Sequence, residues 1–420
     1  MRRLTPALVA AVLIGAGGCA AGQAPTVDSA GSAVGAGVPT ARTAAGFGHL
    51  GGNPEASVEI LGGRVRPGVP TVERQLHDGV LVTLTVTPAR PGWNLVRVDT
   101  AGPAGHDEHQ RHGHHDHTAR PGPVTVGTDP DHLVAATPRP GTDGDWARVR
   151  LPAGASTVYV GHGAEHRLPF PVDTGSASGA PAPTVPGADG PECAAASAGR
   201  VLAGDVSRLD RCPAAALSAD DAADLRAMVT TIADRRVPAV ALLADGSVRG
   251  RAARTVVLKT ATARGLRVVD ASRTHDGALV VVAGWSGASR GLSRAAQEQR
   301  RGVAYEHGVW LAPWLLTPGV VDAVSGTVLP LRFDVRGTEA QTYTAALRRT
   351  LPSVAPTEAG FAGWLRGHRV AYDGPASLYA AARTAFMAAA PGHAQHETTV
   401  GWLPGGTVTR VSAPLKERAG

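Results

Sequence analysis

The chain has few lysines, methionines, cysteines and aromatic residues, and these shortages exclude several functions. Its 420 residues include lysine only at positions 259 and 416, three methionines, three cysteines and 4% aromatics. So few sulfur ligands argue against a dedicated copper(I) site, which is built from cysteine and methionine. The pI of 9.7 would suit nucleic acid, but the arginines are dispersed and few aromatic residues accompany them. We therefore expect no nucleic-acid partner.

Long apolar runs are also missing. The run Leu8–Ile14 follows Arg2 and Arg3 and leads into small residues before Cys19, and this order is typical of a removable signal peptide. The run is far shorter than the roughly 20 residues that a membrane-spanning helix needs. The stretch AGGC resembles a bacterial lipobox, which implies that Cys19 is acylated and anchors the protein at the extracytoplasmic face of a cell membrane. The alternative is an ordinary secretory signal cut near Ala20.

Two cysteines remain, Cys193 and Cys212. An even pair in an exported protein predicts a disulfide, which on the chain-entropy model would stabilise the fold by roughly 3 kcal/mol. The alternative is a pair of free thiols.

Composition divides the chain into five segments. Residues 1–18 are the signal peptide, and residues 19–52, rich in Gly, Ala, Ser and Thr, form a flexible tether. Residues 53–172 contain short alternating segments separated by turns, which predicts an antiparallel β-sandwich. Residues 173–190 read as a linker.

Residues 191–420 form the fifth segment, in which the pattern changes to strands alternating with helices. Ser218 is a good N-cap for a helix, the run 238–244 is a compact apolar strand, and further helices are expected at 339–349, 358–366 and 376–389. Alternating elements predict βαβ units. The predicted fold class is therefore multidomain, an antiparallel β-sandwich followed by an α/β domain with a mostly parallel sheet.

Two family resemblances follow from these segments. The stretch VTLTVTPARPGWNLVRVD with DWARVRLPAGASTVYV resembles small Ig-like sandwiches of the CopC and YtkA type, over about 70 residues. The resemblance implies a fold; the CopC copper site uses an N-terminal histidine, and here lipidated Cys19 is expected in that place.

The C-terminal part resembles one lobe of type I periplasmic solute-binding proteins, the branched-chain amino-acid receptor class. The matching pieces include VALLADGSVRGRAAR and GALVVVAGWSGA, and the match covers about 170 residues. In that family a strand ends in an Asp/Ser/Gly loop and feeds a helix, as Asp245, Gly246, Ser247 and Gly250 do here. Only the fold is carried over, because about 230 residues are too few for two lobes.

The strongest chemical pattern is HDEHQRHGHHDH. Imidazole and carboxylate groups are ligands for zinc, copper(II) and nickel. The predicted metal ligands are His106, Asp107, His109, His112, His114, His115, Asp116 and His117. The segment lies between two predicted strands, so we expect a loop with modest affinity, since binding must order it. The alternative is a polar loop without a metal in the cell.

Three weaker patterns have bland alternatives. His162 and His166, with Glu165 between them, mark a turn that could approach the histidine segment. The alternative is a polar turn without a function. The run Gly284–Ala288 is close to a G-x-S-x-G nucleophile elbow around Ser286. Its catalytic partners would be Asp322 or Asp334 and His368 or His393. The alternative is a plain strand-to-helix turn. Trp310 and Trp314 would line a pocket or, more simply, belong to a core.

The leading hypothesis from the sequence is a membrane-anchored lipoprotein, not an enzyme, that binds transition metal through residues 106–117. The alternative is a solute-binding or sensor lipoprotein that works with a membrane transporter of the ABC type. A serine hydrolase and a structural lipoprotein are further alternatives.

Overall fold

The computed structural model describes residues 58–60, 65–77, 79–101, 123–162, 166–176, 190–207, 209, 211–270, 277–302, 304–371, 374–383, 401–403 and 406–415. The chain divides into two units, residues 1–52 and 53–420, and all described residues belong to the second. The predicted signal peptide and tether lie outside the described residues, as does most of the predicted linker. Within the described residues, no helix has the length and apolar character needed to span a bilayer.

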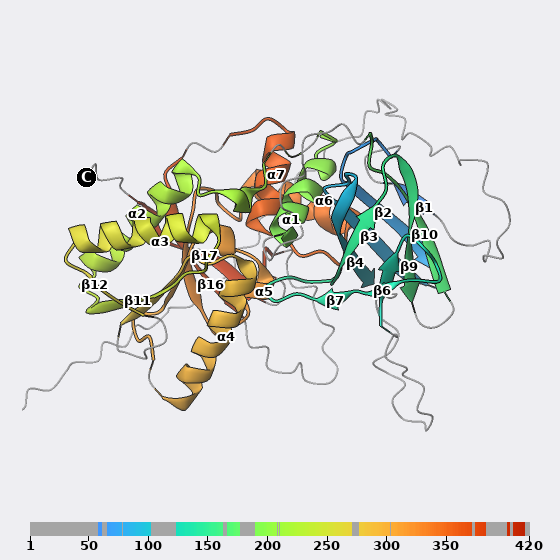
Figure 1. Ribbon diagram of the computed structural model, residues 1–420. Coiled ribbons are helices and arrows are strands. Elements are labelled where there is room, and N and C mark those ends of the chain that lie inside the picture. Colours follow the sequence, from blue (N-terminus) through green and yellow to red (C-terminus); the bar gives the residue numbers. More distant parts are fainter. Residues whose placement is uncertain are drawn as a thin grey trace, which may run out of the picture. The chain divides into compact units, whose positions relative to one another are not determined.

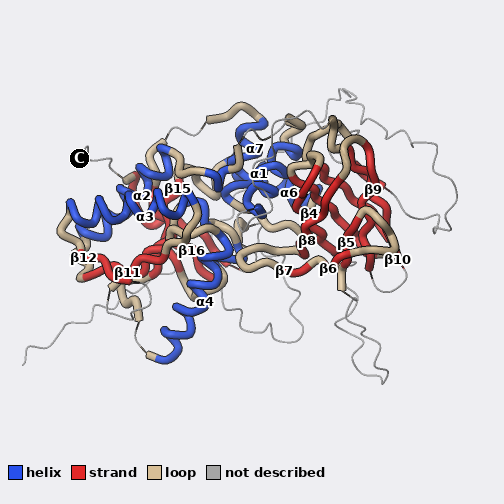
Figure 2. Tube along the Cα trace, in the orientation of Figure 1, coloured by secondary structure: helices blue, strands red, loops and turns tan. Residues whose placement is uncertain are grey.

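Two antiparallel sheets are built from strands β1 to β10, which alternate between the sheets along the chain (Figures 1 and 2). One has the order β1-β2-β3-β4-β8-β7 and the other β10-β9-β5-β6. The bounds of the first are β1 Val58–Ile60, β2 Thr71–His77, β3 Val80–Thr87, β4 Gly92–Ala101, β8 Asp145–Leu151 and β7 Thr137–Pro138. Those of the second are β10 His166–Asp173, β9 Ala155–His162, β5 Thr125–Gly127 and β6 Val134–Ala135.

The two sheets share one apolar core. Alternate residues of β3, such as Leu84 and Val86, are fully buried against Val160, Phe170 and Val172 of the other sheet. The period-two alternation of these strands places one face of each sheet inward. The prediction of two packed antiparallel sheets in this region is therefore confirmed.

The third sheet is mixed, with the order β12-β11-β13-β14-β15-β16-β17. Strands β12 to β15 are parallel, and β16 and β17 are antiparallel. Their bounds are β12 Arg267–Asp270, β11 Ala239–Leu243, β13 Ala278–Val281, β14 Val309–Leu311, β15 Thr327–Leu331, β16 Ser377–Arg383 and β17 Gly406–Pro414. The predicted mostly parallel sheet is thus present, with an antiparallel edge.

The helices are α1 Gly190–Leu202, α2 Ala219–Asp234, α3 Val248–Ala263, α4 Trp285–Arg301, α5 Pro318–Val321, α6 Thr338–Thr350 and α7 Glu358–Gly367. Ser218 caps α2 by accepting a hydrogen bond from the Asp221 backbone, as the sequence predicts, and Ser247 caps α3 in the same way. Helices α2 and α3 pack side by side (Figure 1).

The helix expected at residues 376–389 is wrong for its described part. Ser377–Arg383 is strand β16, paired with β15 on one side and β17 on the other. The alanine-rich sequence favours a helix, but Leu378, Tyr379 and Ala381 are buried when this segment extends the sheet. Burial and ladder hydrogen bonds outweigh a propensity difference of less than about 1 kcal/mol per residue.

Helix α1, absent from our sequence-based elements, connects the antiparallel sheets to the α/β part. It contacts β3 and β4 as well as α7. Its approach to α7 is close enough that a Cβ on Gly199 or Gly363 would overlap backbone oxygens of the other helix. Only small residues permit such a contact, so these glycines set the distance between the two helices.

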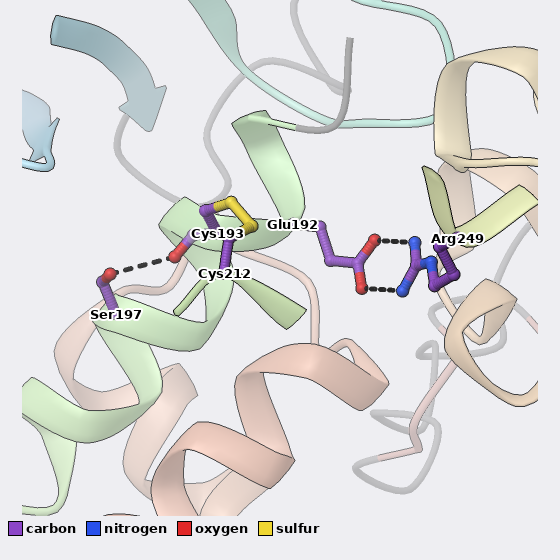
Figure 3. The surroundings of a disulfide bond; sticks show 5 residues. All are labelled: Glu192, Cys193, Ser197, Cys212 and Arg249. Carbon is purple, nitrogen blue, oxygen red and sulfur yellow. Dashed lines mark hydrogen bonds and ion pairs between the residues drawn. A yellow bond between two sulfur atoms is a disulfide. The ribbon is translucent and has the colours of Figure 1, made fainter. Parts of the chain in front are cut away.

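The structure joins Cys193 of α1 to Cys212 in a disulfide, with Cα atoms 5.1 Å apart (Figure 3). Both cysteines are buried against Leu95 and Trp146 of the sandwich. The bond therefore holds the residues before α2 against α1 at the point where α1 meets β4 and β8.

Replacing both cysteines by serine is expected to lower the free energy of unfolding by about 3 kcal/mol, because the closed loop no longer restricts the unfolded chain. Urea denaturation measures the loss. A single Cys193→Ser variant should lose about as much, and an unchanged midpoint in both variants would contradict the prediction.

Candidate functional site

The parallel part of the mixed sheet has a point where the strand order reverses. The chain passes from β11 to β12 on one side, then crosses to β13 on the other. In open α/β sheets, ligands bind at the carboxyl ends of the strands at such a reversal. The residues that follow β11 and β13 are therefore the first candidates for a recognition site.

Asp245, after β11, organises both loops at this point. One carboxylate oxygen accepts hydrogen bonds from the Ser247 hydroxyl at 2.6 Å and its backbone N–H at 3.0 Å. The other accepts from the Gly284 backbone N–H at 2.7 Å. The carboxylate thus lies at the N-terminal ends of α3 and α4, where backbone N–H groups favour a negative charge. The loop that the sequence singled out is built around Asp245.

Two tryptophans fix the neighbouring loops. Trp285 Nε1 donates to the Trp314 carbonyl at 2.8 Å, and Trp314 Nε1 donates to the Ala283 carbonyl at 3.0 Å. Trp310 and Trp314 are 2% and 1% exposed, so the interpretation of this pair as core residues is confirmed.

A loop of the sandwich approaches the carboxyl edge at Trp285. Gly141 has a φ of +83°, and a Cβ there would lie 2.6 Å from the Trp285 carbonyl oxygen. Only glycine tolerates both the backbone conformation and the contact. The loop therefore packs directly on the first residue of α4.

A small cavity of about 20 Å³ lies between the sandwich loop, α1 and the α/β part. Its walls include Arg97, Asp143, Trp285, Tyr343 and Thr357. This volume accommodates one water molecule, and an amino acid is far larger. A solute would therefore need these parts to separate before it could bind at this place.

Next to this edge, a charged pair is fully buried (Figure 3). Arg249 of α3 donates to both carboxylate oxygens of Glu192 of α1, one of them at 2.6 Å, and the side chains are 3% and 1% exposed. The guanidinium carbon lies 4.4 Å from the centre of the Trp314 ring. The pair joins α1 to the carboxyl edge of the sheet.

Further carboxyl groups surround this pair. The pKa of Glu358, at the start of α7, is raised to about 8, mainly by burial and also by the nearby carboxylates Asp221 and Glu192. Burial also raises the pKa of Asp224 to about 6, against the opposing effect of its ion pair with Arg332. Burial thus favours the protonated form of both carboxyl groups.

The predicted nucleophile elbow lacks a base in the described residues. Ser286 is 8% exposed, and its hydroxyl accepts a hydrogen bond from Arg290 at 2.7 Å. An arginine stays protonated and cannot accept the serine proton. His368 instead packs edge-on against Trp364, with ring centres 4.3 Å apart, and Asp322 pairs with Arg383. His393 lies outside the described residues.

The predicted lipidation and metal sites lie outside the described residues, namely Cys19 and His106, Asp107, His109, His112, His114, His115, Asp116 and His117. Of the second histidine group, His166 begins β10 and packs against His77 at the end of β2, with ring centres 4.8 Å apart. Among the described residues, no three His, Cys, Asp or Glu side chains are grouped to hold a metal ion.

The sequence did not single out His77 or Glu192, and it did not predict the ion pair between Glu192 and Arg249. Glu192 and Arg249 are 57 positions apart, and no local pattern signals such a contact. A carboxylate in the first turn of a short alanine-rich helix would have been the one available hint.

Comparisons with known proteins give a partial likeness. No family model and no curated protein matches the chain. A benzoate complex of a solute-binding protein of an ABC transporter from R. palustris is similar at 16% identity and a TM-score of 0.29, over 35% of this chain and 46% of that one. A substrate-binding protein from Desulfitobacterium hafniense in complex with Leu matches at 13% identity and a TM-score of 0.26, over 35% and 47%.

An extracellular ligand-binding receptor from Verminephrobacter eiseniae matches at 16% identity and a TM-score of 0.23, over 35% and 48%. The chain thus spans less than half the length of each of these proteins.

Proposed function

We propose that this protein is an extracytoplasmic solute-recognition lipoprotein that acts with a membrane transporter, anchored through Cys19. The observation that carries the proposal is the reversal of strand order between β11 and β13, with Asp245 bridging the two loops at the carboxyl edge. Folds of this kind recognise small molecules at this position. Solute binding is thus favoured over metal binding, which was the leading hypothesis from the sequence.

The closed packing defines how recognition would work. The sandwich loop at Gly141 and the helix α1 lie against the carboxyl edge, and the cavity between them holds one water molecule. Solute entry would require these parts to move apart, as in other proteins whose ligands bind between two closing bodies. The buried Glu192–Arg249 pair would remain as the connection between α1 and the sheet.

Thermal-shift assays and titration calorimetry on the mature chain in detergent test solute binding, with a panel that includes leucine and benzoate. Asp245→Asn should weaken binding of a recognised solute at least tenfold, because the loops lose charge-assisted hydrogen bonds. The matched control is Asp334→Asn, since Asp334 likewise accepts from the backbone N–H two residues later, at 2.9 Å, but follows β15. Equal affinity in the two variants would contradict the proposed site.

Membrane anchoring is tested separately. Cys19→Ser should move the protein from the membrane fraction to the soluble fraction, because the acyl chains supply the membrane affinity. A variant that stays with the membrane would contradict the lipid anchor and leave the solute test unaffected.

A second candidate function, transition-metal binding by residues 106–117, is supported by the strand registers. Ala101 pairs with Leu81, next to the β2–β3 turn, and Thr125 pairs with Gly161, next to the β9–β10 turn. Ala101 and Thr125, the strand residues on either side of the histidine segment in the sequence, thus lie at the end of the sandwich where His77 meets His166. Changing its six histidines to glutamine should remove most zinc, copper(II) or nickel binding in calorimetry; unchanged stoichiometry and affinity would contradict this function.

A further inference from the structure

Two histidines meet at one end of the sandwich, each from a different sheet. His77 is the last residue of β2, in the first sheet, and His166 is the first residue of β10, in the second. Their ring centres are 4.8 Å apart, with the ring planes at 62°. The imidazoles therefore lie edge to face across the gap between the sheets.

The backbone around both histidines is held in place. Gln75, two residues before His77 on the same face of β2, donates a hydrogen bond from its side-chain amide to the Pro169 carbonyl of β10. On the other side, β10 pairs with β9 from His166 to Asp173. The two strand ends are thus fixed relative to one another, and they hold the two imidazoles next to each other.

We infer that His77 and His166 form a two-histidine site for a divalent transition-metal ion, distinct from residues 106–117. Neutral imidazole nitrogens are good ligands for copper(II), nickel and zinc, and copper(II) binds most tightly of these to a given nitrogen site. Among the described residues, no third His, Cys, Asp or Glu is grouped with them, so the pair supplies two nitrogen ligands. Two ligands give modest affinity.

The partial exposure of the pair makes the site accessible. His166 is exposed, and His77 is half-buried with its Nε2 atom buried, so an ion approaches the pair from the His166 side. The apolar residues of the same core, Leu168 and Phe170, follow His166 along β10 and are buried. The histidines thus stand at the boundary between solvent and the sandwich core.

The test uses the mature chain with the six histidines of residues 106–117 changed to glutamine, titrated with copper(II). This background should keep one equivalent of bound copper(II), with nitrogen hyperfine structure in its EPR spectrum. Adding His166→Gln or His77→Gln should weaken that binding at least tenfold. His132→Gln is the matched control, because His132 is an exposed sandwich histidine that bonds Asp129 at 2.8 Å, and it should leave binding unchanged.

Each outcome decides the inference. Absence of stoichiometric copper(II) binding in the background overturns it, as does binding that survives both His166→Gln and His77→Gln. Because His166 is exposed, its variant should fold, and circular dichroism with an unchanged melting temperature verifies this. If the unmodified chain binds copper(II) and the six-glutamine variant binds none, residues 106–117 are the metal site and the His77–His166 inference is wrong. Solute binding is measured in a separate assay, so neither metal result affects it.

Discussion

Replacing Arg249 by methionine is expected to lower the free energy of unfolding by about 3–5 kcal/mol, the usual cost of removing one partner from a buried ion pair. Glu192 is 1% exposed, so the change would leave its carboxylate without its bidentate partner in a site that water does not reach. The residue also loses its contact with the Trp314 ring. Guanidinium denaturation followed by tryptophan fluorescence measures the loss.

Two comparisons make this result specific. Arg254→Met, at an exposed position of the same helix, should change the free energy of unfolding by less than about 0.5 kcal/mol. The double variant Glu192→Met/Arg249→Met should be more stable than Arg249→Met alone, since replacing a whole buried pair by apolar side chains is often neutral. A loss below about 1 kcal/mol for Arg249→Met would show that the pair does not hold α1 to the sheet.

Replacing Glu73 by glutamine is expected to stabilise the protein in alkaline solution. Glu73 is fully buried inside the sandwich, and its two carboxyl oxygens have no hydrogen-bond partner among the described residues. Burial raises its pKa from 4.5 to about 8. The folded protein therefore keeps a proton that the unfolded chain releases.

The pH dependence follows from this difference. Stability from Glu73 is fully present below about pH 4.5 and is lost as the pH rises toward 8. With about 1.4 kcal/mol for each pKa unit, the rise from 4.5 to about 8 corresponds to a loss of about 5 kcal/mol. The glutamine variant has no such loss, so it should match the parent near pH 4.5 and exceed it clearly at pH 9.

Denaturation curves at pH 4.5, 7 and 9 measure this effect. Glu358 and Asp224 also have raised pKa values, so the useful quantity is the difference between parent and variant, in which their contributions cancel. Glu306→Gln, at an exposed position, is the matched control. Its difference in unfolding free energy from the parent should not change with pH. A pH-independent difference for Glu73→Gln would contradict a buried protonated carboxyl group.

Local patterns predicted much of the fold. The helix that begins after Ser218 and the strand within residues 238–244 follow from a capping residue and an apolar run, and α2 and β11 are found there. The alternating segments GVLVTLTVTP, residues 79–88, and NLVRVDT, residues 94–100, predicted strands, and β3 and β4 are found there. These signals succeed because they concern residues within a few positions of each other.

The candidate site was only partly predictable. The Asp245–Gly250 loop was recognised from its position after a strand, but its hydrogen bond to Gly284 spans 39 residues. The sandwich loop at Gly141 that meets Trp285, and the contact of His77 with His166, likewise join segments with no local relationship. Such contacts depend on how the sheets and helices pack.

The sequence by itself therefore determined the type and approximate order of the elements, because helix capping, strand alternation and turn chemistry act over short distances. Only the tertiary structure decided that Ser377–Arg383 is a strand, that α1 lies against both the sandwich and α7, and that Glu192 meets Arg249. The physical reason is burial. Free energy from removing apolar surface and pairing buried charges depends on neighbours that are distant in the chain, and it exceeds local propensity where the two disagree.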